Sequence, residues 1–161
     1  MQFRMDAGVN KGASVMVTFN ELYEQNHIIA ERIKIVKFLV KDRSICDTDI
    51  TRDMFFDLTD RIKNHMDMEE RELYKKLLIH KDQSVKQTAE NFLSGAVEIR
   101  RMFKKFMKRW CHHQQLRIKD HDQFVKDTYD IFNMYEDRII SETEKLYPVV
   151  RLVFGAEIKS A

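Results

Sequence analysis

Residues 50–79 read ITRDMFFDLTDRIKNHMDMEERELYKKLLI, a run without glycine or proline. Apolar residues recur in it every three or four positions, as the buried face of an amphipathic helix requires. The predicted inward residues are Ile50, Met54, Leu58, Ile62 and Leu73. The stretch therefore predicts one long helix, with an inward stripe that is interrupted between Ile62 and Leu73.

Three further helices are predicted around this one, at about residues 18–41, 86–112 and 121–147. Their inward residues are Phe19, Leu22, Ile29, Ile33, Val36 and Val40; then Ala89, Phe92, Ala96, Ile99, Phe103, Phe106 and Trp110; and finally Phe124, Thr128, Ile131, Tyr135 and Leu146. Four amphipathic helices joined by short polar turns predict an all-α fold, an antiparallel up-down-up-down four-helix bundle.

The length of the chain suits one domain. Its 161 residues, 43% of them hydrophobic, are enough for one core and too few for two. We expect the bundle at residues 18–150, between a flexible N-terminal tail at 1–17 and a C-terminal tail at 151–161. Pro148 marks the end of the last helix or a kink in it.

The charge and cysteine content narrow the classes of protein. Charged residues make up 34% of the chain but nearly cancel, to a net charge of +2, so no nucleic-acid partner is expected. Cys46 and Cys111 lie far apart and form no CxxC motif, which favours a reducing compartment. No leading apolar segment and no uncharged apolar run of about 18 residues is present. A cytoplasmic protein without a membrane partner is expected.

Polar residues stand at positions that the helical period assigns to the interior. Seven residues after Leu58 comes His65, and seven residues after Ile62 comes Glu69. A histidine and a glutamate four residues apart share one face of a helix, where they can bind a metal ion together. The HxxxE spacing alone is common by chance, and its register with the apolar stripe is what favours a site.

The last predicted helix carries polar residues in the same way. Tyr135 is followed by Arg138 and Glu142 at the inward spacing, and His27 lies at the edge of the stripe of the first helix. Five ionisable groups thus point toward one level of the bundle. Buried charges are costly unless they are paired or bind a metal, so this cluster requires an explanation.

Two segments of the sequence echo each other. HMDMEERELY (65–74) and RIISETEKLYP (138–148) both place an acid four residues after the leading residue and a Leu-Tyr pair eight and nine residues after it. The first segment leads with a histidine and the second with an arginine.

The two segments, with His27, resemble the hemerythrin-like, or HHE cation-binding, domain family. Its hallmark is a histidine followed four and five residues later by Glu-Glu, and then a Leu-Tyr/Phe-Pro ending; Lys75 stands here where the family often has proline. The resemblance covers about residues 18–150. It implies a four-helix bundle around a non-haem di-iron centre, used for oxygen binding, oxygen or redox sensing, iron handling, or protection against nitric oxide and peroxide.

The chain departs from the family pattern at two places. Arg138 stands where the family has a histidine, and the third helix offers Ala96 inward and no histidine. The metal ligands that the resemblance carries over are His27, His65, Glu69 and Glu142. Arg138 is expected to balance charge by filling the space between the two carboxylates. This reduced set predicts one ion, with iron the first candidate, in place of a di-iron centre, and iron, oxygen or redox sensing or iron binding rather than oxygen transport.

A metal-free core is the alternative. In it Arg138 replaces the metal, and the chain is a regulatory module that binds a protein partner. The segments HMDMEER (65–71) and DRIISETEKL (137–146) also resemble, more weakly, the Rsd/AlgQ-type anti-sigma regulators, which bind the primary sigma factor. No nucleophile motif and no glycine-rich phosphate loop is present, so no enzyme is predicted.

One basic segment stands outside these patterns. RRMFKKFMKR (100–109) mixes six Lys or Arg with four apolar residues. The simplest interpretation is the solvated face of a helix, and a binding face for a partner or a phosphate-bearing ligand is the alternative. His112, His113 and His121 are expected in or near a polar loop.

Overall fold

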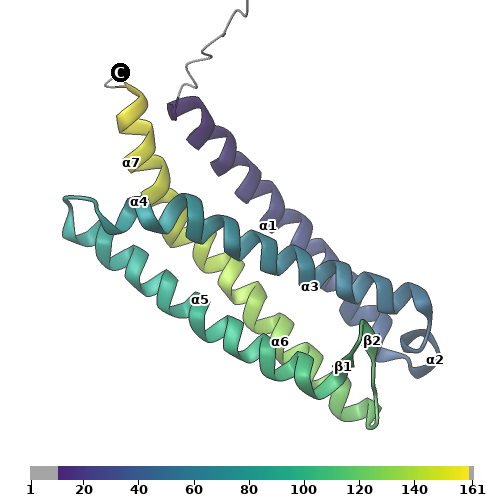
Figure 1. The fold of residues 1–161 in the computed structure, drawn as a ribbon. Helices are drawn as coiled ribbons and strands as arrows, with labels where there is room; N and C mark the ends of the chain where they lie inside the picture. The colour runs from purple at the N-terminus through teal and green to yellow at the C-terminus, as the bar shows by residue number, and fades with distance from the viewer. Residues whose placement is uncertain (1–10, 160–161) are drawn as a thin grey trace, which may run out of the picture.

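The computed structural model describes the backbone of residues 11–159 and the side chains of residues 19–155 (Figure 1). Its elements are α1 (Lys11–Lys41), α2 (Arg43–Cys46), α3 (Asp49–Glu69), the π-helical turn η1 (Glu70–Tyr74), α4 (Lys75–Leu78), α5 (Gln83–Trp110), β1 (Cys111–His112), β2 (Gln115–Leu116), α6 (His121–Ser141), the π-helical turn η2 (Glu142–Leu146) and α7 (Tyr147–Lys159). The fold is all-α, as predicted, because the strands found in this part of the chain form only a two-stranded hairpin.

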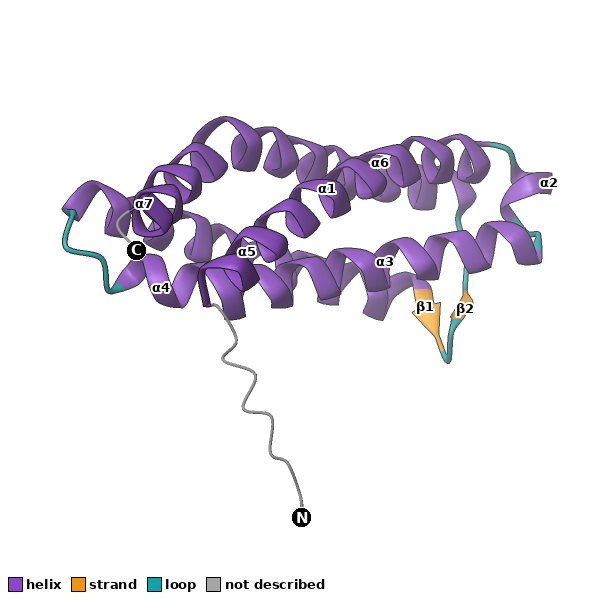
Figure 2. Cartoon of the chain, turned by 90° about the horizontal axis from the view of Figure 1, so that it is seen from above, coloured by secondary structure: helices purple, strands orange, loops and turns teal. Residues whose placement is uncertain are grey.

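Long helical runs lie side by side (Figures 1 and 2). α3, η1 and α4 follow one another without a break, and so do α6, η2 and α7, so each run contains a π-turn between two α-helices. α1 contacts both α3 and α6, while α5 contacts α4, α6 and both π-turns. None of the helices in the described residues is long and apolar enough to cross a membrane.

Polar side chains fix where the helices begin. Four residues accept a hydrogen bond from a backbone N–H in the first turn, which would otherwise lack a partner: Asp42, Thr48, Asp82 and Asp120. α5 ends at Trp110, two residues before the predicted bound, because the chain turns there into the β1–β2 hairpin. The two residues at its tip, His113 and Gln114, have left-handed φ angles of 47° and 58°, which this tight turn requires.

Other helices extend beyond their predicted bounds. α1 begins at Lys11, so residues 11–17 are helical rather than a flexible tail; the rest of that predicted tail, residues 1–10, lies outside the described residues. At the other end, α7 continues to Lys159 through most of the predicted C-terminal tail.

Pro148 does not end the helix. It lies one residue after Tyr147, whose N–H donates to the carbonyl of Glu142, five residues back, in the wider bonding pattern of a π-turn. Proline lacks an N–H and crowds the preceding helical turn. Since π-turns already break the regular i to i−4 ladder, the proline is accommodated where the ladder is disturbed.

The core consists of two apolar clusters. Val36, Phe55, Phe106 and Phe132 belong to the cluster nearer the hairpin. Leu22, Leu73, Ala89, Leu146 and Val150 belong to the other. Ile50, predicted inward, is 68% exposed, since the buried stripe of α3 runs through Thr51, Phe55 and Leu58 and leaves Ile50 one position off that face.

Candidate metal centre

A layer of buried polar side chains separates the two apolar clusters. His65 and Glu69 come from α3, Arg138 from the last turn of α6, Glu142 from the first residue of η2, and Asn26 from α1. All five are buried, with His65, Glu69 and Glu142 fully enclosed. On each of these helices the neighbouring buried apolar residues belong to one cluster on one side of the layer and to the other cluster on the other side. Four of the five ionisable groups predicted at one level lie in this layer, and the fifth, His27, does not.

The two π-turns explain the echo in the sequence. Each turn starts at or directly after the acid, and each ends at a Leu-Tyr pair of which both members are buried. A π-turn carries one extra residue per turn, so it moves the tyrosine onto the inner face beside the leucine. Both hydroxyl groups reach the polar layer: that of Tyr74 contacts Arg138, and that of Tyr147 contacts Glu142.

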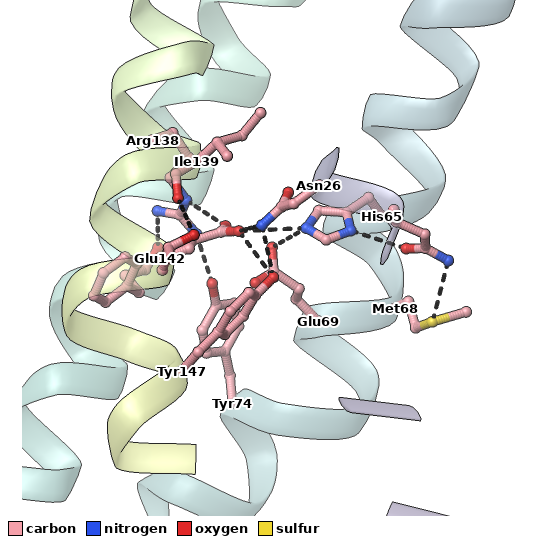
Figure 3. Close-up of polar contacts among 12 residues, drawn as sticks. Asn26, His65, Met68, Glu69, Tyr74, Arg138, Ile139, Glu142 and Tyr147 are labelled. Atoms are coloured by element: carbon pink, nitrogen blue, oxygen red, sulfur yellow. Dashed lines mark hydrogen bonds and ion pairs between the residues drawn. The ribbon is translucent and has the colours of Figure 1, made fainter. Parts of the chain in front are cut away.

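His65 is held in one orientation (Figure 3). Its Nδ1 lies 2.8 Å from Oε1 of Gln25, and because an amide oxygen only accepts, Nδ1 carries the proton. The amide of Gln25 is itself oriented by a contact from its Nε2 to the sulfur of Met68 at 3.7 Å. The other ring nitrogen, Nε2, lies 3.2 Å from Glu69 Oε1 and 3.4 Å from Glu142 Oε2.

Glu142 has polar partners at both carboxylate oxygens. Arg138 Nε donates to Oε1 at 2.8 Å. The side-chain amide of Asn26 and the hydroxyl of Tyr147 donate to Oε2 at 2.6 Å and 3.2 Å. This carboxylate is fully compensated by groups of the protein.

Arg138 makes no hydrogen bond to Glu69. Besides Glu142, its guanidinium donates to the carbonyl of Phe92 at 2.9 Å and to the hydroxyl of Tyr74 at 2.5 Å. It also lies 4.9 Å from the ring centroid of Phe92. The expectation that Arg138 bridges the two carboxylates is therefore wrong, because its remaining donors are used by α5 and Tyr74.

Gly95 makes the space for this arginine. A Cβ atom at position 95 would lie only 3.0 Å from Nη1 of Arg138. α5 thus contributes a backbone carbonyl and a missing side chain to the layer, which is why it carries no inward histidine there.

Glu69 differs from Glu142 in having no hydrogen bond. Both of its carboxylate oxygens are buried without a hydrogen-bond partner. The 3.2 Å approach of His65 Nε2 to Oε1 is an ion-pair distance, but its angles are not those of a hydrogen bond. An uncompensated buried carboxylate is costly, and the nearest group that can compensate it is the imidazole.

The charges of the layer shift its pKa values. Burial disfavours the imidazolium of His65, but Glu69 and Glu142 outweigh it and raise its pKa to about 9. Burial, and then the charge of Glu142, raise the pKa of Glu69 to about 8. For Glu142 burial acts upward as well, yet the contacts with His65, Glu69 and Arg138 lower its pKa to about 2. Glu142 is therefore a fixed anion, while His65 and Glu69 gain and lose their protons at mildly alkaline pH.

Three of the four predicted ligands come together. His65, Glu69 and Glu142 each offer one ligand atom, and these atoms all lie within 4.8 Å of one another. His27 is exposed on α1 and is not part of the group. The buried position belongs to Asn26, four residues after Leu22 and three before Ile29, so the apolar period itself could have identified it. The sequence prediction of the site thus lacked four residues of the layer: Gln25, Asn26, Tyr74 and Tyr147.

The other histidines lie away from this layer. His112 and His113 are exposed in the hairpin, as the polar segment indicates. His121 Nε2 lies 2.8 Å from the carbonyl of Val40, a contact that ties the start of α6 to the end of α1.

The residues present fit a single metal ion. One imidazole and two carboxylates are a donor set that suits iron, zinc or manganese. The outer nitrogen of His65 is held by an amide oxygen, which is the usual way in which proteins orient a metal-binding histidine. Both oxygens of Glu69 lack a hydrogen-bond partner, so this group can exchange its proton for a bound cation.

No family model, no curated protein and no solved structure matches the chain. What the site can do must therefore be argued from its own residues.

Proposed function

We propose that the chain is a hemerythrin-like protein whose core binds one metal ion, with iron as the physiological ion, through His65, Glu69 and Glu142. The function of this protein is the sensing of iron, oxygen or redox state, or the binding of iron, rather than oxygen transport. The observation that carries the proposal is the position of His65 Nε2, which faces two buried carboxylates while Nδ1 is fixed by Gln25. Such an arrangement requires a cation between the three groups, either a proton or a metal ion.

The proposal includes the predicted topology, an antiparallel up-down-up-down four-helix bundle. Its support is the short connections between the long helical runs, at residues 42–48, 79–82 and 111–120, and the contacts of α1 with α3 and α6. Short connections favour antiparallel neighbours. We also propose a cytoplasmic location, since Cys46 and Cys111 are both free thiols.

A single ion is favoured over a pair because Arg138 supplies a permanent positive charge on the far oxygen of Glu142. That oxygen is not free to bridge to a second ion, and α5 brings a glycine rather than an imidazole to this level. Bound iron would supply redox chemistry at the site. The residues of the chain would hold it, keep it from water and balance its charge.

The direct test is the metal content of the protein purified without added metal or chelator. We expect about one ion per chain, and Glu69→Gln should lower the affinity for the metal at least about tenfold. Glu70→Gln is the matched control, because the neighbouring Glu70 side chain is 52% exposed and forms a surface ion pair with Arg100 at 3.4 Å. About two irons per chain with the near-ultraviolet bands of an oxo bridge would contradict the role given to Arg138.

A metal-free regulatory module is the second candidate, and Glu142 favours it. Its pairing with Arg138, Asn26 and Tyr147 leaves it compensated without any ion. In that case His65 holds a proton instead of a metal, and the function lies in binding a protein partner. A protein free of metal, whose melting temperature does not change on adding iron, zinc or manganese, would reject the metal proposal and favour this one.

A further inference from the structure

α5 carries a dense row of positive charge on its outer side. The row consists of Arg100, Arg101, Lys104, Lys105, Lys108 and Arg109. Carboxylates of the protein neutralise its three arginines: Arg100 pairs with Asp67 at 2.8 Å, Arg101 with Glu98 at 2.6 Å, and Arg109 with Asp127 at 3.1 Å.

The three lysines of the row remain without a carboxylate. Lys104, Lys105 and Lys108 are exposed, and none of them has an ion pair or hydrogen bond with any side chain of residues 19–155. We call these three lysines the α5 ridge. In a chain with a net charge of only +2, this is a local excess of positive charge that the protein itself does not balance.

A groove with an apolar floor runs along each side of the α5 ridge. The groove between α3 and α5 has a volume of about 300 Å³, and Ile62, Met66, Phe103 and Met107 are among its lining residues. The groove between α5 and α6 has a volume of about 270 Å³, and its apolar lining consists of Met102, Phe106 and Ile131. Packed helices commonly leave grooves between them; this face is marked by lysines without a carboxylate partner that stand between two grooves with apolar linings.

We propose that this face binds an amphipathic helix of a partner protein, with acidic side chains along the α5 ridge and large apolar side chains in the two grooves. Helices that dock in grooves bind through apolar residues at every third or fourth position. The methionines suit such a partner, since their flexible, polarisable side chains adapt to different apolar groups. Charge complementarity with the ridge would set the orientation and the rate of binding.

The acidic residues of the grooves argue against a nucleic-acid ligand. Asp60 lines the groove on the α3 side, and Asp127 and Asp130 line the groove on the α6 side. Asp127 and Asp130 are paired with Arg109 and Lys126, so a phosphate backbone laid across the face would gain little attraction outside the α5 ridge. A peptide helix can place its acids on the ridge and neutral or basic residues beside the rims.

The probe is a synthetic helical peptide with one stripe of glutamate at every third or fourth position, a stripe of leucine on each side of it, and neutral polar residues on the far face. A peptide of the same composition in scrambled order and a single-stranded RNA of equal charge serve as comparison ligands. We expect Lys104→Glu/Lys105→Glu/Lys108→Glu to weaken peptide binding about tenfold or more at low salt. The matched control, Lys75→Glu/Lys81→Glu/Lys119→Glu, reverses three exposed lysines elsewhere and should bind as the unmodified protein does.

Methyl resonances of methionine locate the bound peptide. Met102 and Met107 should shift on titration, whereas Met68, on the α1 side beside Gln25, should not. The proposal is overturned if the peptide does not bind, if the two triple variants bind it equally, if the scrambled peptide or the RNA binds more tightly, or if Met68 shifts while Met102 and Met107 do not.

Discussion

Glu69 and Glu142 occupy equivalent places in two helices that carry the same short pattern. Each lies four residues after the leading residue, at or next to the start of a π-turn, and each is fully buried. Their surroundings differ. The oxygens of Glu142 accept hydrogen bonds from Arg138, Asn26 and Tyr147, whereas those of Glu69 accept none.

The leading residue accounts for this difference. Arg138 carries a permanent charge and donates to Glu142 Oε1 at 2.8 Å, so Glu142 keeps a cationic partner at every pH, in addition to its 3.4 Å contact with His65 Nε2. The Glu142 half of the layer is closed in this sense. His65 can lose its proton, so its pairing with Glu69 depends on pH or on a bound cation. The layer thus has a closed half around Glu142 and an open half around Glu69. Four changes would break or sharpen this comparison.

The largest effect is expected from removing the charge that closes the Glu142 half. Arg138→Met leaves the carboxylate of Glu142 buried without its cation, and leaves Tyr74 and the carbonyl of Phe92 without their donor. Breaking a buried pair from one side typically costs about 3–5 kcal/mol. Chemical denaturation measures the change in unfolding free energy. Arg101→Met, which removes an exposed ion pair with Glu98, should have no resolvable effect on the unfolding free energy. A similar cost for both variants would contradict the role of Arg138 in compensating the buried charge of Glu142.

The second effect is the pH dependence of the open half in metal-free protein. The pKa of His65 is raised from 6.5 to about 9, so its stabilisation is complete below pH 6.5 and is lost as the pH rises through 9. The pKa of Glu69, raised from 4.5 to about 8, acts in the same direction, because the folded state favours its protonated form. We expect the unfolding free energy to fall by about 4 kcal/mol from pH 6.5 to 9, with roughly equal contributions from His65 and Glu69.

Two variants separate the halves in this pH titration. Glu69→Gln should flatten the alkaline slope, since it removes one titrating group and the anion that raises the pKa of the other. Glu142 has a lowered pKa, so its stabilisation is present above pH 4.5 and is lost only as the pH falls toward 2. An unfolding free energy that stays constant or rises between pH 6.5 and 9 in the unmodified protein would refute the pH-dependent pairing of His65 with Glu69.

A smaller effect is expected from crowding Arg138 through Gly95. In Gly95→Ala the new methyl group would lie 3.0 Å from Nη1 of Arg138, so the buried guanidinium must move by a few tenths of an ångström. Because both variants gain helix propensity, the over-packing should make Gly95→Ala about 2 kcal/mol less stable than Gly155→Ala. Gly155→Ala is the matched control, because a Cβ there meets nothing within 4 Å and helix propensity favours alanine by up to about 1 kcal/mol. Equal stability of the two variants would show that α5 does not shape the position of Arg138.

Much of the fold followed from the sequence because its apolar period is long and regular. The stripes through Leu58, Ile62 and Leu73 on α3 and through Phe92, Ala96 and Ile99 on α5 are buried as predicted. Helix ends were harder to predict from the sequence, because a π-turn lets the helix continue past Pro148. No known residue pattern predicts a π-turn. The echoed Leu-Tyr pair marks both π-turns, but its meaning emerges only from the structure.

The buried cluster of the candidate site contains three of the four predicted ligands. His65, Glu69 and Glu142 follow from helical spacing, and a spacing argument can place residues within one helix. Contacts between helices depend on rotation and axial shift, which one sequence does not specify. For that reason the sequence predicts His27 as the ligand from α1, whereas Asn26 is buried. The contact between Gln25 of α1 and His65 of α3 does not follow from spacing within either helix.

The smallest effect concerns that partner, and it separates the predicted ligand His27 from the observed contact. Gln25→Leu removes the acceptor of His65 Nδ1, which frees the ring to rotate and to exchange tautomers. In the proposed metal site, loss of such an outer contact should weaken metal binding about tenfold, or about 1.4 kcal/mol, while helix content by circular dichroism stays unchanged. His27→Ala, two residues further along α1, is the matched control. It should bind metal as the unmodified protein does, because His27 is exposed. If competition with a metal-sensitive dye instead shows that His27→Ala weakens binding and Gln25→Leu does not, the orientation of His65 by Gln25 has no role in the site, and a rearranged α1 must bring His27 inward.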